Sequence, residues 1–393
     1  MFTAAVLAVT GLGAALALLT VYLLLLTFAA LFASRKPPRP GRAMRRFAVL
    51  VPAHNEEALI GRLLTSLGEV DYPADHFDVC VVADNCTDET ANIARSSGAL
   101  VYERHDTTHQ AKGYALRWLL QQLRQANRTY DAYVIIDADS LVEPNLLRSM
   151  DARMDAGSQV IQAYYSVHNS RQSAVAGLRY AALAAVHYVR PLGRSLLGLS
   201  CGLKGNGMCF AAPIIERFGW DWFTLAEDVE FHLALVRDGI KVDFAPETSV
   251  QAEMPVTLHQ AASQNARWER GRLQLIRRHV PGLIKSGLLP LSPVRLDAAV
   301  EQLIPPLSVP FALCGVCFVL GLGLGAVEAT LLAGISLVGQ VGYLLVGLVL
   351  VRAPLSTYVA LSAAPVYIAW KVALYGRALF GGRAAAWVRT ARI

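Results

Sequence analysis

An α/β domain flanked by membrane-spanning helices is the fold class that this sequence predicts, and three observations predict it. The 393 residues are 54% hydrophobic but only 17% charged, whereas soluble domains carry about 25% charged residues. Apolar runs occupy the first 34 residues and the stretch from residue 303 onward. Between them, short apolar runs alternate with helix-like stretches, as in a largely parallel α/β sheet. This composition excludes disordered and collagen-like chains.

The N-terminal segment, residues 1–34, is expected to be one uncleaved transmembrane helix. Residues 7–32 are nearly all apolar, which is enough to cross about 30 Å of hydrocarbon. A cleaved signal peptide would have Lys or Arg before its apolar run, and no Lys or Arg precedes this one. A basic cluster follows it, and such clusters stay on the cytoplasmic side, so the next domain is expected in the cytoplasm. The cluster consists of Arg35, Lys36, Arg39, Arg42, Arg45 and Arg46.

Residues 35–256 are expected to form the cytoplasmic α/β domain. In sheets of this kind, binding and catalytic loops lie at the carboxyl ends of the strands. Residues that carry chemistry are therefore sought directly after each expected strand. The expected strands are 47–51, 79–83, 99–102, 133–136 and 160–164.

The rest of the chain is expected to contact the membrane. Residues 257–302 mix Leu and Ile with many Arg, which is typical of helices lying on the cytoplasmic leaflet. Within 303–376, the runs 303–325 and 329–351 are each long enough to span, and a weaker third run follows at 354–375. We expect two crossings, with the third run in the interface or re-entrant. The basic tail, 377–393, then lies in the cytoplasm. Its arginines are Arg377, Arg383, Arg389 and Arg392.

The net charge of +6 is explained by this membrane layout. Much of the excess lies at 35–46 and after residue 376, beside apolar segments, as the positive-inside rule predicts. We therefore expect a lipid bilayer as a partner and no nucleic acid. The expected location is the cell inner (plasma) membrane, with several crossings.

A pair of carboxylates follows the expected strand 133–136. Asp137 and Asp139 are two residues apart, and carboxylates at the end of a buried strand are costly unless they meet a cation. Mg²⁺ binds through one or two carboxylates together with substrate phosphates. In the functional interpretation, the two acids bind a divalent ion together with a diphosphate. In the structural interpretation, they only form a polar strand end, and one Asp caps the next helix.

Other polar clusters are equally open to two interpretations. Asp84 directly follows a strand, as a nucleoside-binding acid would, or it caps the next helix. Glu227 and Asp228 begin a helical stretch, where acids favourably oppose the helix dipole.

A third cluster lies in the segment expected on the membrane surface. Gln264, Arg267 and Trp268 are within about one turn and can share a helix face. Arg can pair with a pyrophosphate and Trp can stack on a sugar ring. A membrane-surface helix explains the Arg and the Trp equally well.

Taken together, these motifs resemble the membrane-bound family-2 glycosyltransferases. Cellulose, chitin and hyaluronan synthases and ceramide glucosyltransferase have a D, D-x-D, E/T-D, Q-x-x-R-W signature. The chain contains Asp84, Asp137-Ala-Asp139, Glu227-Asp228 and Gln264-x-x-Arg267-Trp268 in the same order. The resemblance covers residues 45–280 together with the membrane layout. It implies the GT-A fold, which is a nucleotide-sugar-binding α/β domain.

The resemblance also implies the roles of the donor-binding residues. Pro52, Glu56 and Asp84 would line the uridine pocket, and Lys112 would lie near the nucleotide. Asp137 and Asp139 would hold the diphosphate through Mg²⁺ or Mn²⁺, with Asp139 as the direct metal ligand. Gln264 and Arg267 would bind the pyrophosphate.

For the transfer itself, the resemblance implies that Asp228 is the base and that Trp268 forms the acceptor floor. Glu227 is the rival base, and since neighbours on a helix point about 100° apart, only one of the two acids is expected to face the acceptor. The expected enzyme is an inverting hexosyltransferase that moves a sugar from a UDP-sugar to a hydroxyl of a growing β-linked glycan. The alternatives are a single transfer to a lipid acceptor and, third, a non-enzymatic membrane assembly subunit.

Overall fold

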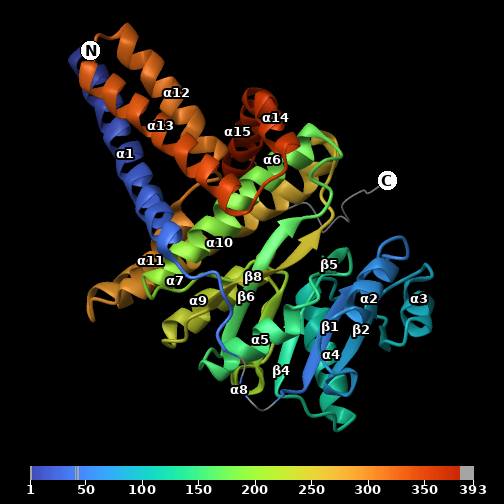
Figure 1. Ribbon diagram of the computed structural model, residues 1–393. Helices are drawn as coiled ribbons and strands as arrows, with labels where there is room; N and C mark the ends of the chain where they lie inside the picture. The colour runs from blue at the N-terminus through green and yellow to red at the C-terminus, as the bar shows by residue number, and fades with distance from the viewer. Residues whose placement is uncertain (1, 40, 42–43, 381–393) are drawn as a thin grey trace.

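A computed structural model describes residues 2–39, 41 and 44–380 of the chain (Figure 1). Arg42, Arg383, Arg389 and Arg392, on which part of the topology prediction rests, lie outside the described residues. A sheet with helices on both faces forms one end of the molecule. Three long helices, α1, α12 and α13, project from it as a bundle, and the N-terminus lies at the far end of that bundle.

The sheet has eight strands in the order β3-β2-β1-β4-β7-β6-β8-β5. All five predicted strands are present, within a few residues of the expected limits. The prediction of a largely parallel sheet is confirmed for four of the seven strand pairs, including β6 with β8, whereas β7 pairs antiparallel with β4 and β6, and β5 with β8. Strands β5 and β7 are short runs between polar loops, and hydrophobic periodicity does not reveal strands of this length. The strands are β1 (Phe47–Ala53), β2 (Phe77–Asp84), β3 (Leu100–Arg104), β4 (Ala132–Ile135), β5 (Ser140–Val142), β6 (Val160–Val167), β7 (Met208–Ala211) and β8 (Asp243–Ala252).

The sheet is covered on both faces because its central strands are apolar on both. Val49 of β1 packs in one core with α2 and α5, and its neighbour Leu50 packs in the other with α4. Both side chains are fully buried, and such burial contributes about 1.5–3 kcal/mol each. The helices of this domain are α2 (Ile60–Gly68), α3 (Thr90–Ser96), α4 (Lys112–Gln125), α5 (Leu146–Asp155), α6 (Ala174–Leu183), α7 (Arg190–Leu196), α8 (Ala212–Phe218) and α9 (Glu227–Arg237), with shorter turns at Ala74–His76 and Ala184–Val189.

Within the described residues, three helical segments are long and apolar enough to cross a membrane: α1 (Phe2–Phe32), α13 (Val327–Leu350) and Leu355–Arg377. The expected continuous run 303–325 is broken instead. A short non-helical break separates helix α11 (Pro293–Leu303) from helix α12 (Ser308–Gly323), and the two helices are bent by 69° relative to each other. Pro305 and Pro306 lie at the break, and proline lacks the N–H that a continuing helix needs. Helix α12 alone, at 16 residues, is about 24 Å long.

The weak third segment packs against the rest of the protein through a charged residue. It forms α14 (Leu355–Ala360), a short turn at Leu361–Ala363 and α15 (Ala364–Phe380). Lys371 of α15 lies 3.0 Å from Glu269 and 2.5 Å from the Asn265 amide oxygen. Both partners are on α10 (Leu258–Leu288), a 31-residue helix that begins with a capping box at Thr257. In Figure 1, α14 and α15 accordingly lie beside α6 and α10.

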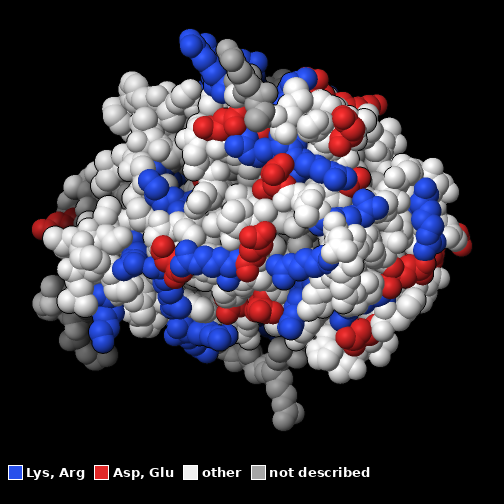
Figure 2. All heavy atoms as spheres, turned by 90° about the horizontal axis from the view of Figure 1, so that it is seen from below, with Lys and Arg blue, Asp and Glu red and all other residues white. Residues whose placement is uncertain are grey.

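The end of the molecule away from the bundle has mixed charge. Figure 2 shows Lys and Arg interspersed with Asp and Glu there, rather than gathered in one basic patch. Ion pairs of the α/β domain explain the pattern: Arg45 with Asp151, Arg46 with Asp78, and Arg148 with Asp71. Much of the positive charge of this domain is therefore neutralised locally.

Candidate active site

One cavity of about 520 Å³ lies at the carboxyl ends of β1, β2 and β4, between the sheet and helices α9 and α10. This volume is in the range of small-molecule sites. Every site residue that the sequence predicted lines it, although the residues span more than half of the chain. They are Pro52, Glu56, Asp84, Lys112, Asp137, Asp139, Asp228, Gln264, Arg267 and Trp268.

At one end of the cavity, Asp84 is held by an arginine that the sequence analysis missed. Arg104 donates to the Asp84 carboxylate at 2.6 Å and to Asp106 at 2.8 Å. Burial raises the pKa of Asp84, and Arg104 opposes that rise. The parallel register places Asp84 beside Arg104 at the ends of β2 and β3, so only the strand pairing identifies this residue.

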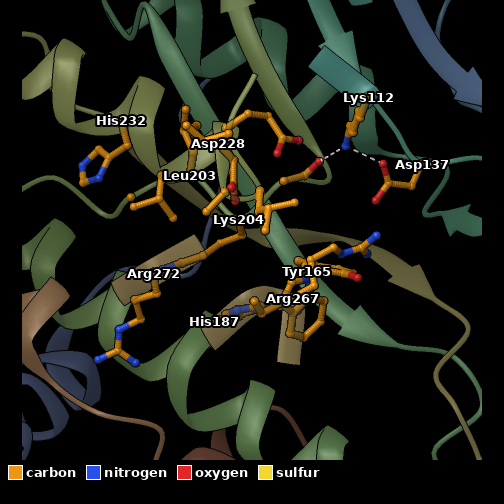
Figure 3. A pocket seen from close by; sticks show the side chains of 18 of the residues that line it. Lys112, Asp137, Tyr165, His187, Leu203, Lys204, Asp228, His232, Arg267 and Arg272 are labelled. Carbon is orange, nitrogen blue, oxygen red and sulfur yellow. Dashed lines mark hydrogen bonds and ion pairs between the residues drawn. The ribbon is translucent and has the colours of Figure 1, made fainter. Parts of the chain in front are cut away.

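Lys112, at the start of α4, supplies a cation to the half-buried carboxylates at the end of β4. Its ammonium lies 2.5 Å from the Asp137 carboxylate and 2.5 Å from the carbonyl oxygen of Gly205 (Figure 3). Burial favours the neutral amine, but Asp137 and Glu227 outweigh it and raise the pKa of Lys112. The ammonium group of Lys112 thus connects three segments of the chain that are distant in sequence.

The carboxylates Asp137 and Asp139 fit a divalent ion that is completed by a ligand. Among the residues that the structure describes, no group of three or more His, Cys, Asp or Glu is arranged to hold a metal. Two carboxylates are nevertheless the usual protein share of a Mg²⁺ site whose other ligands are water and substrate phosphates. Both Asp137 and Asp139 line the cavity, so the donor set is suitable once a diphosphate is present.

The loop from Gly202 to Gly207 fixes the geometry around these acids. The Asn206 side chain accepts from the Asp137 amide at 3.1 Å and donates to Ser140 at 2.8 Å. Gly205 has φ +81°, and a Cβ there would lie 3.3 Å from the Asp228 carboxylate. Glycine therefore allows the backbone to approach Asp228 closely.

The acids Glu227 and Asp228, at the start of α9, both line the cavity. Lining the cavity does not decide which of the two acids faces the acceptor, so the expectation that only one of them does so stays a prediction. Burial and the charge of Asp228 raise the pKa of Glu227 to about 7. Burial also raises the pKa of Asp228, but the Val229 amide, Lys112 and Lys204 oppose it. Lys112 and Lys204 therefore favour the charged form of Asp228 against the effect of burial.

Arg179 of α6 positions the Gln264-x-x-Arg267-Trp268 motif. It donates to Gln264 at 3.1 Å, and its guanidinium lies 4.7 Å from the centre of the Trp268 ring. It also donates to Asn265 at 2.7 Å. Arg179 is buried and lies 85 residues from Gln264 along the chain. No sequence signal connects the two, since their contact depends on the packing of α6 on α10.

Comparisons with known proteins identify the family of this chain. The model of the family described as "Glycosyltransferase like family 2" matches residues 45–271. A beta-monoglucosyldiacylglycerol synthase of Synechocystis sp. is 27% identical over 233 residues, which are 58% of this chain and 47% of that protein. The probable glycosyltransferase YdaM of Bacillus subtilis is 23% identical over 244 residues, or 60% of this chain and 57% of that protein. The chain thus spans about half the length of these curated relatives.

A solved structure resembles nearly the whole chain. The mannosyltransferase PcManGT of Pyrobaculum calidifontis, in complex with GDP-Man and Mn²⁺, matches with a TM-score of 0.61 and 19% identity. The match covers 98% of this chain and 100% of that chain. At this identity the likeness concerns the fold, which is the expected GT-A arrangement.

Proposed function

The chain belongs to glycosyltransferase-like family 2, and we propose that it is an inverting membrane hexosyltransferase that uses a UDP-sugar. The observation that carries this proposal is the meeting of the acids, Lys112 and the Gln264-x-x-Arg267-Trp268 helix in one cavity. A degenerate, non-enzymatic subunit would not be expected to retain the complete set. Transfer goes to a hydroxyl of a growing β-linked glycan or, as a second candidate, of a lipid.

In the proposed mechanism, Pro52, Glu56 and Asp84 bind the uridine end of the donor. Lys112 and Arg267 balance the charge of the diphosphate, and Gln264 adds hydrogen bonds. Asp139, with Asp137 beside it, would hold the Mg²⁺ or Mn²⁺ ion, which stabilises negative charge on the departing diphosphate. The Mn²⁺ complex of PcManGT supports a divalent metal.

Asp228 is the proposed general base. It takes the proton from the acceptor hydroxyl while that oxygen attacks the anomeric carbon, and the nucleoside diphosphate departs on the opposite side. One displacement inverts the anomer, so an α-linked donor gives a β-linked product. Trp268, oriented by Arg179, forms the floor on which the acceptor rests.

A specific feature of the cavity favours the lipid acceptor as a second candidate. The segment that joins α11 to α12 lines it with Ile304, Pro305, Pro306 and Leu307, and α12 packs against α1 in the bundle. The site is thus continuous with the helices that we propose to lie in the membrane. The name of the monoglucosyldiacylglycerol synthase agrees with a lipid acceptor.

The test is nucleotide release by the purified protein with a panel of UDP- and GDP-sugars, with and without added lipid. We expect release with one UDP-sugar and a radiolabelled product. A ladder of products identifies glycan synthesis, and a single organic-extractable product identifies a glycolipid. Absence of release and of transfer with every donor and acceptor would refute the enzyme.

For the membrane layout, we propose residues 35–256 as the cytoplasmic catalytic domain, 257–302 as interface helices and 303–376 as membrane segments of an inner-membrane protein. A reporter fused at the C-terminus is expected to read as cytoplasmic. The reason is that Lys371 in the last segment pairs with Glu269 of the catalytic site helix, which holds α15 at the domain rather than across the bilayer. A periplasmic reading would show that Leu355–Arg377 spans.

We also predict an acid limb in the pH profile of kcat/KM. Asp228 acts only when deprotonated, and its pKa is raised by burial, so activity is expected to fall with decreasing pH well before the ordinary Asp value of about 3.9. Lys204 lowers the pKa of Asp228. Lys204→Gln should therefore move the acid limb to higher pH, whereas an unchanged limb would argue against Asp228 as the titrating base.

A further inference from the structure

The cavity has two ends of opposite charge. The donor end contains Asp84, Asp137, Asp139, Glu227 and Asp228. The other end, which we name the inner chamber, lies toward α7, α11 and the 304–307 segment. Its charged lining includes Arg190, Arg194, Lys204, Arg272, Asp297 and Glu301, and Glu269 also lines the cavity. Figure 3 shows Asp228 between Lys112 on the donor side and Lys204 and Arg272 on the inner side.

The two acids of the inner chamber, Asp297 and Glu301, both form ion pairs with the same arginine. Arg194, only 1% exposed, donates to Asp297 at 2.8 Å and to Glu301 at 2.5 Å. Glu301 also lies 3.5 Å from Arg190 and 3.9 Å from Lys204. One carboxylate is thus shared among three cations, and Arg194 alone makes a close, complete ion pair.

The positive charge of Arg272 is the one in the inner chamber that is least neutralised by nearby acids. Its guanidinium donates twice to the Gln302 carbonyl oxygen, at 3.1 and 3.2 Å. The acid one turn earlier on the same helix, Glu269, is bound by Lys371 at 3.0 Å. Burial lowers the pKa values of both Arg272 and Lys204, and the neighbouring acids, Glu301 foremost for Lys204 and Glu269 for Arg272, oppose this shift only in part. Buried cations of this kind are normally paired.

We propose that Lys204 and Arg272 bind the phosphate of the acceptor, and that the acceptor is a phospholipid whose headgroup also carries a hydroxyl. The phosphate supplies the missing negative charge. The headgroup hydroxyl can then reach Asp228, which lies between the chamber and the donor end. The acyl chains leave along Ile304 and Leu307 toward the bundle. This inference rests on the proposed function and specifies its acceptor.

The transfer step balances without any further reactant. The headgroup C–O–H loses its proton to Asp228, its oxygen forms a bond to the anomeric carbon, and the bond from that carbon to the diphosphate breaks. The products are a β-glycosylated phospholipid and a nucleoside diphosphate. The lipid phosphate is bound throughout and makes or breaks no bond.

The test compares acceptors with full-length protein in nanodiscs. Phosphatidylglycerol, diacylglycerol, soluble glycerol 3-phosphate and a polyprenyl phosphate are supplied in parallel, and transfer is measured with the active donor. We expect phosphatidylglycerol to be the best acceptor. Equal or better transfer to diacylglycerol overturns the phosphate requirement. Preference for glycerol 3-phosphate overturns the lipid, and preference for polyprenyl phosphate overturns the headgroup hydroxyl.

Variants locate the effect in the inner chamber. Arg272→Gln should raise the KM for phosphatidylglycerol about 10- to 150-fold, the loss expected for one hydrogen bond to a charged group. The KM for the donor should change little. Arg272→Lys, which keeps the charge, should recover part of the affinity. Arg277→Gln, an exposed arginine of the same helix, is the matched control and should behave like wild type.

Lipid retention gives a readout that does not need turnover. In native mass spectrometry, wild-type protein should retain phosphatidylglycerol in preference to diacylglycerol, and Arg272→Gln should lose that preference. Equal retention by both proteins refutes the inference even if transfer is observed. Absence of transfer with preserved retention instead counts against the proposed function alone, so the two failures are distinguishable.

Discussion

Replacing Asp228 by Asn is expected to reduce sugar transfer by about 10²- to 10⁴-fold, the usual contribution of a general base. Asn has nearly the same size and hydrogen-bonding reach but cannot accept the proton. The affinity for UDP should change little, because the proposed nucleotide contacts lie at Asp84 and Lys112. A loss confined to turnover is the signature of an interaction made in the transition state. Steady-state kinetics and calorimetric titration with UDP measure the two quantities.

Glu227→Gln is the matched control. Both acids line the cavity, so location alone does not choose between them. Burial raises the pKa of Glu227 to about 7, which favours its protonated form, whereas Lys204 lowers the pKa of Asp228 and favours its charged form. The Glu227 variant should therefore be the milder one. If it abolished transfer while Asp228→Asn stayed active, the base would have to be reassigned to Glu227.

Asp139→Ala is expected to remove metal-dependent nucleotide binding. Wild-type protein should bind UDP at least about 10²-fold more tightly with Mn²⁺ or Mg²⁺ than with a chelator, since a metal bridging protein and phosphate contributes several kcal/mol. The variant should show the weak, chelator-like affinity under both conditions, and transfer should vanish. Calorimetric titration with UDP in the presence of Mn²⁺, and again with chelator, measures this difference.

Asp75→Ala serves as the control for a lost surface carboxylate. The Asp75 side chain is 84% exposed and does not line the cavity, so this variant should retain the full metal effect. Equal UDP affinity of wild-type protein with and without metal would contradict the roles of Asp137 and Asp139. In that case Lys112, already 2.5 Å from Asp137, would have to balance the diphosphate charge.

The sequence by itself determined the class of the fold and identified most of the residues of the proposed donor site. Short apolar runs ending in Pro52, Asp84 and Asp137 predict strands, and parallel strands bring their carboxyl ends to one edge. The structure places these residues around one cavity. Strand β7 and the break at 304–307 were not predicted, because a four-residue strand has no readable period and an apolar run hides the effect of two prolines.

Only the tertiary structure decided which residues support the site. Arg104 beside Asp84, Arg179 under Trp268 and Arg272 in the inner chamber each act across elements distant in sequence. Arginines are common in this chain, and nothing in their spacing distinguishes these from surface arginines. Their roles come from burial: a guanidinium excluded from water must find an acceptor or an anion, and packing of α6, α7 and α11 against the sheet and α10 determines which one it finds.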